Sequence, residues 1–333
     1  MARVFSGIQP SGDMHLGNYL GALRRFVDEQ DVHESFFCIV DLHALTVPQD
    51  PAELRVRTVG TGALYLAAGL DPARSTLFAQ SMVPAHAELG WLMACTVSMG
   101  ELRRMTQFKE KAEGQDFVSA GLFTYPALMA ADILLYDTER VPVGDDQRQH
   151  LELTRDVAMR FNARFGRTFV VPEAAIAGAA ARVMDLQAPT KKMSKSVESP
   201  QGTVLVLDEA KVVERKIRRA VTDPGDEVRY DPTAKPGVSN LLSILAAATG
   251  GDPAALADGY SQYGPLKADT AEAVVELLRP VRERYAELAE DPGQVAKVLA
   301  EGAERAAAVA ATTLARAQEA VGLPPRNGGP DPR

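Results

Sequence analysis

The chain has 333 residues, 46% of them hydrophobic and 24% charged, which is an ordinary globular composition and long enough for two domains. No apolar run reaches the roughly 18 to 20 residues that span a bilayer, and no signal-peptide core is expected at the N-terminus. The net charge of −8 argues against a nucleic-acid binder, as an average over the whole chain. With two isolated cysteines, Cys38 and Cys95, a CxxC zinc site or a four-cysteine iron–sulfur site cannot be built from this chain alone. We therefore expect a cytoplasmic protein.

Predicted strands and helices alternate through the first part of the chain. Short apolar runs of strand length occur at residues 4–8, 35–40, 75–79, 140–143 and 181–185. Apolar residues at helical spacing predict helices at residues 16–27, 51–69, 84–97, 101–113, 118–136 and 147–165. This alternation predicts an α/β fold over residues 1–203, with a doubly wound, Rossmann-like parallel sheet between two layers of helices.

Only helical patterns follow residue 203. They occupy residues 208–221, 238–249, 252–262, 267–290 and 293–321, with proline and glycine between them. We expect an all-helical domain at residues 204–322, whose last helix could pack back on the first domain. Residues 323–333, rich in proline and glycine, are expected to be a disordered tail.

Polar residues follow each of the predicted strands. They are Gln9 and His15, Asp41 and His43, Gln80, residues 144–147, and Lys192–Ser196. A doubly wound sheet binds ligands at the carboxyl ends of its strands, near the point where the strand order reverses. Because packing alone does not explain polar groups at all of these ends, we expect a ligand site there.

Two short runs in this set could bind one polyphosphate. The run Pro10–Asn18 is a turn into a helix whose first N–H groups favour phosphate, with His15 as a further donor and Gly17 allowing close approach. The run Lys192–Ser196 (KMSKS) places two lysines on a loop that could close over the phosphates and stabilise developing charge. Taken singly, either run could equally be an ordinary turn or a solvated basic loop, and neither is a P-loop or a dinucleotide fingerprint.

The segment 122–136 is a nearly apolar helix with one interior charge, Asp132. Such a carboxylate is costly to bury unless it is paired, either with a core partner or with a substrate donor. Met129 lies one turn earlier on the same face, and Tyr125 a further turn back. An apolar pocket with a single acceptor suits an aromatic ring with one donor, and both an indole N–H and a phenol O–H meet this requirement.

At this point the sequence resembles a known family. The runs GIQPSGDMHLGNYLGAL, MTQFKEK, TYPALMAADILLYDTERVPVGDDQRQHLELTRD and PTKKMSKS are similar to those of bacterial tryptophanyl-tRNA synthetases, and the resemblance extends to about residue 322. The first and last runs are signatures of class I aminoacyl-tRNA synthetases in general, whereas the long block points to the tryptophan enzymes. The resemblance implies activation of L-tryptophan with Mg-ATP, transfer to tRNA(Trp), a homodimer, and an anticodon-reading helical domain.

The resemblance also implies roles for individual residues. The residues that would contact ATP are Gln9, Pro10, Ser11, Gly17, Asn18, Gly144, Asp145, Asp146, Val183, Lys192, Met193, Ser194, Lys195 and Ser196. Those that would bind tryptophan are Phe5, Gly7, Gln9, His43, Tyr125, Met129, Asp132, Val141, Val143 and Gln147. The catalytic set would be His15, Asn18, Lys111, Lys192 and Lys195.

Within these sets the resemblance makes Asp132 the acceptor of the indole N–H and gives the α-amino group to Tyr125 and Gln147. Lys111 would help to hold the phosphates, while His15 is compatible with a family that has either histidine or threonine at this position. Magnesium would arrive with ATP, and no zinc, iron–sulfur cluster or dedicated metal site is expected.

Three alternatives remain open from the sequence. A tyrosyl-tRNA synthetase shares the architecture and the aromatic pocket. A small-molecule nucleotidylyltransferase shares the phosphate chemistry, but it does not need the long helical segment after the lysine loop. A non-catalytic paralogue that binds tryptophan or RNA does not need intact glycine and lysine signatures.

Overall fold

The computed structural model describes residues 1–10, 13–106, 108, 117–143, 147–176, 183–194 and 200–324. Its centre is a five-stranded sheet with the strand order β3–β2–β1–β4–β5 and parallel pairing throughout. The strands are β1 (Arg3–Ile8), β2 (Glu34–Ile39), β3 (Thr76–Ala79), β4 (Arg140–Val143) and β5 (Glu173–Ile176). The strand order reverses beside β1, which confirms the predicted doubly wound, Rossmann-like sheet.

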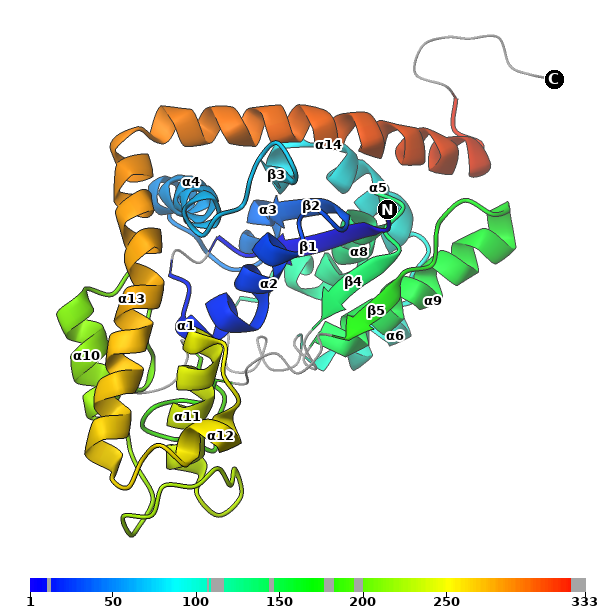
Figure 1. Ribbon diagram of the computed structural model, residues 1–333. Helices are drawn as coiled ribbons and strands as arrows, with labels where there is room; N and C mark the ends of the chain where they lie inside the picture. Colours follow the sequence, from blue (N-terminus) through cyan, green and yellow to red (C-terminus); the bar gives the residue numbers. More distant parts are fainter. Residues whose placement is uncertain are drawn as a thin grey trace.

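Helices cover both faces of the sheet (Figure 1). Those of the sheet region are α1 (Leu16–Asn18), η1 (Tyr19–Leu23), α2 (Arg24–Asp28), α3 (Asp41–Ala44), α4 (Pro51–Ala67), η2 (Gln80–Met82), α5 (Ala85–Ala94), α6 (Met99–Arg104), α8 (Ala120–Leu134) and α9 (Arg148–Phe165). The later ones are η4 (Pro200–Gly202), α10 (Ala210–Arg218), α11 (Pro236–Thr249), α12 (Pro253–Ala257), α13 (Tyr263–Glu290) and α14 (Pro292–Ala320). None of the described helices is long and apolar enough to cross a membrane.

The helical segment after β1 starts at His15, whose Nδ1 accepts a hydrogen bond from the Asn18 N–H at 3.2 Å. Leu16 and Leu23 are fully buried on its inner face, as the hydrophobic spacing predicts. The segment is not one continuous α-helix, because Tyr19–Leu23 forms the wider π-helical turn η1. Hydrophobic spacing does not reveal such a turn, which occurs often near functional sites.

The fifth strand of the sheet is not where the sequence predicts it. Residues 181–185 were the predicted strand, but Glu173–Ile176 forms β5 and pairs with β4. Residues 181 and 182 lie outside the described part, and what the structure describes of this region is an isolated antiparallel bridge between Met184 and Lys192. The lysine loop therefore follows a short antiparallel contact and not a strand of the sheet.

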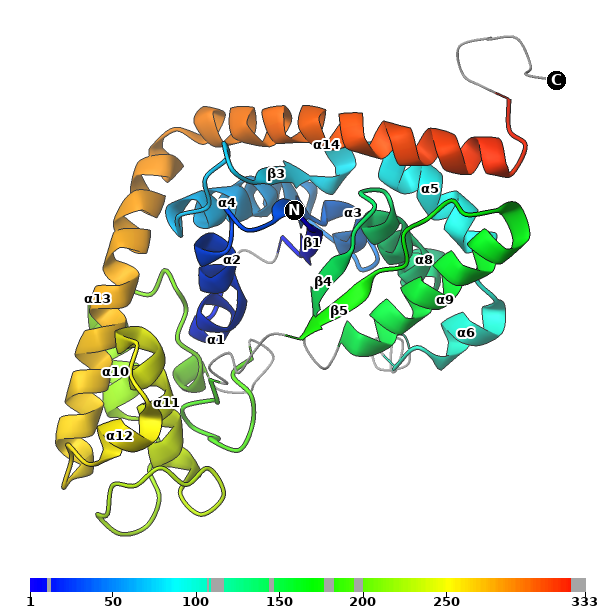
Figure 2. The same ribbon diagram turned by 45° about the vertical axis from the view of Figure 1, so that its right-hand side comes forward.

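The five helices predicted after residue 203 are present, although α12 ends at Ala257 rather than near residue 262. Figure 2 shows α13 running from the sheet region toward α10, α11 and α12. One hydrophobic cluster includes Leu16 and Leu64 of the sheet region together with Val238 and Leu266 of the later helices. Because the core is continuous, the division at residues 203 and 204 stays a prediction. The predicted disordered tail lies outside the described residues from position 325 onward.

The last helix, α14, packs along the edge strand β3 (Figures 1 and 2). Its Gly302 comes so close that a Cβ atom there would lie 1.9 Å from the Leu77 carbonyl oxygen. The Arg305 guanidinium adds a hydrogen bond to the Pro72 carbonyl at 2.9 Å. An open edge strand presents unpaired N–H and C=O groups, so α14 covers a vulnerable side of the sheet, and only glycine permits this approach.

Candidate active site

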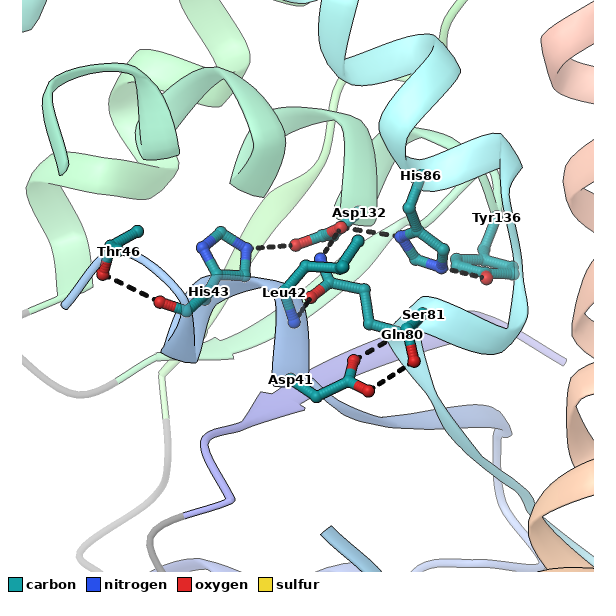
Figure 3. Close-up of polar contacts among 9 residues, drawn as sticks. All are labelled: Asp41, Leu42, His43, Thr46, Gln80, Ser81, His86, Asp132 and Tyr136. Atoms are coloured by element: carbon teal, nitrogen blue, oxygen red, sulfur yellow. Dashed lines mark hydrogen bonds and ion pairs between the residues drawn. The ribbon is translucent and has the colours of Figure 1, made fainter. Parts of the chain in front are cut away.

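The buried carboxylate of Asp132 is the centre of a hydrogen-bonded network near the carboxyl ends of the strands (Figure 3). Its Oδ1 lies 2.7 Å from Gln80 Nε2 and 2.6 Å from His86 Nδ1. Its Oδ2 lies 2.7 Å from His43 Nε2. Only 1% of the Asp132 surface is exposed, so the single charge of the predicted apolar helix is buried together with three polar partners.

Three separate elements bring these partners to Asp132 in α8. His43 lies in α3, directly after β2; Gln80 is the first residue of η2, directly after β3; and His86 lies in α5. Gln80 is also fixed from its other end, because its Oε1 accepts a hydrogen bond from the Leu42 N–H at 3.2 Å. The polar residues predicted at the ends of two strands therefore converge on the predicted carboxylate.

The surroundings of Asp132 keep its carboxylate ionised. Burial alone raises the pKa of a carboxyl group. The hydrogen bonds from His43 and His86 and the electrostatic interactions with both imidazoles outweigh burial and hold the pKa of Asp132 well below its usual range. The side chain is therefore a charged, fixed acceptor, which forms stronger hydrogen bonds than a neutral one.

Behind Asp132 the network enters an aromatic cluster. His86 Nε2 lies 2.7 Å from the hydroxyl of Tyr136. The Tyr136 ring stacks on Phe5 and Phe36, with ring centroids 5.5 and 4.6 Å away. Phe5, which the family resemblance assigns to the tryptophan pocket, is thus part of the rigid packing that supports the acceptor.

On the other side of His43, the network continues to Tyr125. The two rings pack edge to face with centroids 6.2 Å apart, and the Tyr125 hydroxyl lies 2.5 Å from His150 Nε2. Met129 lies between Tyr125 and Asp132 along α8 and is partly buried. The face of α8 predicted from helical spacing is therefore the face that approaches His43.

The other residues predicted for the aromatic pocket come from the central strands and from the start of α9. Val141 of β4 is buried, whereas Gly7 of β1 and the following Gln9 are exposed. Gln147 directly precedes α9 and is partly buried. The side chain of Val143 lies outside the described part. Contacts of these residues with a ligand stay predictions.

The predicted phosphate site begins with a tight turn at the start of α1. His15 is buried, and a Cβ atom at Gly17 would lie 3.1 Å from its ring. The same Cβ would lie 3.5 Å from Val183, so glycine leaves space between these two side chains. Asn18 is exposed and Pro10 is buried. The structure therefore places four of the predicted ATP-binding residues, with His15, around one helix start or just before it.

A short extended segment, residues 203–206, joins this turn to the lysine loop. The Val204 carbonyl accepts a hydrogen bond from the Leu16 N–H at 2.8 Å. The Thr203 hydroxyl donates to the Ser194 carbonyl at 2.9 Å. Hydrogen bonds through Thr203 and Val204 thus connect the two runs that the sequence predicts to bind one polyphosphate.

Backbone contacts anchor the described part of the lysine loop. The Met193 N–H donates to the Val183 carbonyl at 3.1 Å, and the Met193 side chain is buried. Lys192 is exposed to solvent. The described part of the loop thus combines an anchored base with an exposed lysine, and the contact of this lysine with a phosphate stays a prediction.

Some predicted site residues lie outside the described part of the chain, so their contacts stay predictions. They are Ser11, Lys111, Gly144, Asp145, Asp146, Lys195 and Ser196. Within the described ranges, no group of three histidine, cysteine, aspartate or glutamate side chains could hold a metal ion.

Sequence reasoning missed His86, Tyr136 and His150, and it noted Gln80 only as a polar residue after a strand. His86 meets Asp132 across 46 residues of chain, and His150 meets Tyr125 across 25. Hydrophobic periodicity reports only local order, so it carries no signal for such pairs. The cost of burying the charge of Asp132 is the one signal in the sequence that this residue needs polar partners.

The doubly wound sheet, the buried acceptor Asp132 and the helix start joined to the lysine loop define a class I aminoacyl-tRNA synthetase. The model of a family described as tRNA synthetases class I (W and Y) matches residues 1–279, and the chain belongs to this family.

Individual relatives match almost the whole chain. A tryptophan–tRNA ligase of Caldanaerobacter subterraneus is 57% identical over 325 residues, which cover 97% of this chain and 99% of that protein. The crystal structure of tryptophanyl-tRNA synthetase from Mycoplasma pneumoniae has a TM-score of 0.90 at 39% identity and covers 97% of this chain and 98% of its own. The structure from Campylobacter jejuni, complexed with ADP and tryptophan, has a TM-score of 0.83 at 36% identity, over 96% of this chain and all (100%) of that one.

Proposed function

We propose that this chain is a tryptophan–tRNA ligase. The observation that carries the proposal is the buried, ionised acceptor Asp132 in an apolar helix, because an indole ring offers one N–H donor and otherwise needs apolar walls. The names of the relatives, which match nearly the full chain, support the same substrate. The relative solved with ADP and tryptophan supports a nucleotide and an amino acid as partners in one site.

The reaction has two steps, and the chain forms no covalent bond in either. A carboxylate oxygen of tryptophan attacks the α-phosphorus of Mg-ATP, and the bond between this phosphorus and the oxygen that bridges to the β-phosphate breaks. Pyrophosphate departs, and tryptophanyl-adenylate stays on the enzyme. The terminal 2′-hydroxyl of tRNA(Trp) then attacks the acyl carbon and loses its proton, and AMP leaves. Catalysis therefore depends on orienting the reactants and on stabilising charge on the departing pyrophosphate.

The phosphate side of the site supplies that stabilisation. The helix start at His15 and Asn18 and the exposed Lys192 are the described groups that support this role. Lys111 and Lys195 are proposed to add positive charge, and magnesium enters as part of the Mg-ATP substrate. The site acts in the cytoplasm, where tRNA is charged.

An amino-acid-dependent pyrophosphate-exchange panel tests the substrate. The full chain is incubated with Mg-ATP, labelled pyrophosphate and, in turn, tryptophan, tyrosine or phenylalanine. We expect label to enter ATP with tryptophan and to do so at least roughly 100-fold more slowly with the other two, because phenylalanine has no ring donor and the phenol of tyrosine carries its donor at a different position from an indole N–H. Exchange that depends on tyrosine would assign the tyrosine alternative instead. No exchange with any amino acid would indicate a non-catalytic paralogue.

We also propose that the enzyme is a homodimer. Large apolar side chains are exposed on the elements between α3 and α6, namely Leu45, Met82, Trp91 and Met99. Trp91, the single tryptophan of the chain, is 70% exposed. Several exposed apolar side chains in one region are typical of an association surface, which supports a second copy of this chain as the occupant.

Sedimentation velocity with the wild type and Trp91→Glu tests the dimer. We expect a dimer for the wild type at micromolar concentration and a monomer for the variant, because a buried carboxylate at the contact is unfavourable. The emission of Trp91 should also move to longer wavelength when the wild type is diluted to dissociation. A wild type that sediments as a monomer would overturn the dimer, and a variant that remains dimeric would move the interface away from α5.

A further inference from the structure

His86 is fully buried, and each nitrogen of its ring has a partner. Nδ1 lies 2.6 Å from Asp132 Oδ1, and Nε2 lies 2.7 Å from the Tyr136 hydroxyl, so the imidazole joins the carboxylate to the phenol (Figure 3). A neutral imidazole has one donor nitrogen and one acceptor nitrogen. Its partners therefore determine which nitrogen carries the hydrogen.

The Tyr136 hydroxyl determines the direction of these hydrogen bonds. Its ring packs against Phe36 and Phe78, which offer no acceptor. Burial raises the pKa of Tyr136 well above its ordinary value, so the O–H group keeps its proton. A buried hydroxyl hydrogen without an acceptor is strongly unfavourable, and His86 Nε2 lies within reach. Tyr136 therefore donates to Nε2, Nδ1 carries the hydrogen, and His86 donates to Asp132.

Two donors then hold Oδ1 of Asp132, whereas Oδ2 has one described partner, His43, and a second lone pair that can accept from another donor. Oδ1 accepts from Gln80 and His86, and turning the carboxylate would break both hydrogen bonds. Figure 3 shows His43, the described partner of Oδ2, on the opposite side of the carboxylate from His86. His43 packs edge-on to Tyr125, a residue proposed to bind the amino acid, so Oδ2 is the oxygen on the substrate side.

We propose that His86 and Tyr136 are positioning residues for amino-acid selection, which orient Asp132 so that its Oδ2 accepts the ring N–H of tryptophan. The inference rests on the proposed function and extends it, because neither residue needs to touch the substrate. Tyr136 donates to Nε2 and so keeps the hydrogen of His86 on Nδ1, the nitrogen that donates to Asp132.

Titratable groups from α8, the turn after it and β2 lie around this contact. Asp132 and Tyr136 come from α8 and the turn that follows it, and Cys38 of β2 is near enough to Tyr136 to affect its pKa. Burial raises the pKa of the Cys38 thiol, so this group stays neutral. On the outer side of α5, Gln318 of α14 donates to Glu88 at 3.4 Å. Asp132 is thus the charged group that a described hydrogen bond joins to His86.

Tyr136→Phe removes one hydroxyl and tests the hydrogen-bonded relay from Tyr136 through His86 to Asp132. We expect the KM for tryptophan to rise by about 5- to 10-fold, the effect of one weakened hydrogen bond, while the KM for ATP stays unchanged. Without the tyrosine donor, the hydrogen of His86 can move from Nδ1 to Nε2, and Nδ1 then no longer donates to Asp132.

Two comparisons separate positioning from general loss of structure. Tyr65→Phe removes another buried tyrosine hydroxyl, in the other hydrophobic cluster, and should leave both KM values at the wild-type level. His86→Asn keeps an N–H donor near the position of Nδ1, so it should retain more tryptophan affinity than His86→Leu.

The outcomes distinguish this inference from the proposed function. A wild type without tryptophan-dependent exchange would overturn the function and the relay together. If the wild type is active, then a Tyr136→Phe enzyme with the wild-type KM for tryptophan would overturn the relay alone. Equal rises in the KM for tryptophan and for ATP would also overturn it, because they would indicate a general disturbance of the fold.

Discussion

Replacing Asp132 with asparagine is expected to lower kcat/KM for tryptophan by roughly 10- to 150-fold, the effect of losing one hydrogen bond to a charged acceptor. The carboxylate is buried and accepts from both sides, so both of its oxygens are needed as acceptors. An asparagine amide has no charge and must turn its NH2 group toward one set of donors. Pyrophosphate exchange at varied tryptophan concentration measures the loss.

An amino-acid analogue isolates the role of the ring N–H. In the benzothiophene analogue of tryptophan, sulfur replaces this group, so the shape is kept and the donor is lost. The wild type should prefer tryptophan to the analogue by roughly 100-fold, and Asp132→Asn should lose most of this preference. Asp41→Asn, which removes a neighbouring carboxylate bonded to the Ser81 N–H at 2.9 Å, should keep it. An Asp132→Asn enzyme with the full preference would contradict the assigned acceptor.

These assays belong at neutral pH, because the charge of Asp132 also stabilises the fold. Removing the charge from a buried, paired carboxylate costs about 3–5 kcal/mol. The pKa of Asp132 is held below its ordinary value of 3.8. Its contribution to stability is therefore complete above about pH 4 and is lost as the pH falls through the lower, folded-state pKa. At neutral pH this loss of stability does not change with pH. The activities of the variant and the wild type can then be compared at equal concentrations of folded enzyme.

Replacing Lys195 with alanine is expected to slow adenylate formation by about 100- to 1,000-fold, the usual effect of removing one group that stabilises developing charge. The affinity for tryptophan should change little, because the lysine loop belongs to the phosphate side of the site. Lys195 lies outside the described residues, but the base of its loop is anchored at Met193 and the neighbouring Lys192 is exposed. Single-turnover measurement of pyrophosphate release separates the rate from binding.

Lys191→Ala is the matched control for Lys195. This residue also carries an exposed lysine side chain at the start of the same loop, and its backbone carbonyl accepts a hydrogen bond from the Asp185 N–H at 2.9 Å. Alanine keeps that backbone contact and removes only the charge, so the rate should stay within a few-fold of wild type. Equal losses in rate for the two variants would reduce the role of Lys195 to a general effect of positive charge.

The sequence predicted the parts of the site that depend on local chemistry. The lone charge of Asp132 in an apolar helix required partners, and His43 after a buried strand placed one of them at the correct edge of the sheet. Both predictions rest on the cost of burying polar groups and on the geometry of parallel strands, and these hold whatever the details of packing. The structure confirms that Asp132 is buried with polar partners and shows His43 as one of them at 2.7 Å, a pairing that the sequence did not predict.

Other parts depend on tertiary contacts that leave no local pattern. The segment Glu173–Ile176 has the sequence EAAI, which has little β-propensity, and it becomes β5 because β4 offers it a pairing edge. Residues 181–185 look more like a strand but do not enter the sheet in their described part. His86 likewise acquires its role only when α5 and α8 pack together.

The cover that α14 gives to β3 has a consequence for how the chain is made. Translation produces β3 early and Gly302 near the end, so the nascent sheet keeps an open edge until the last long helix leaves the ribosome. During that interval the strand can pair with other unfinished chains. A message cut short before α14 would therefore yield an aggregation-prone product, even though every strand of the sheet would be present.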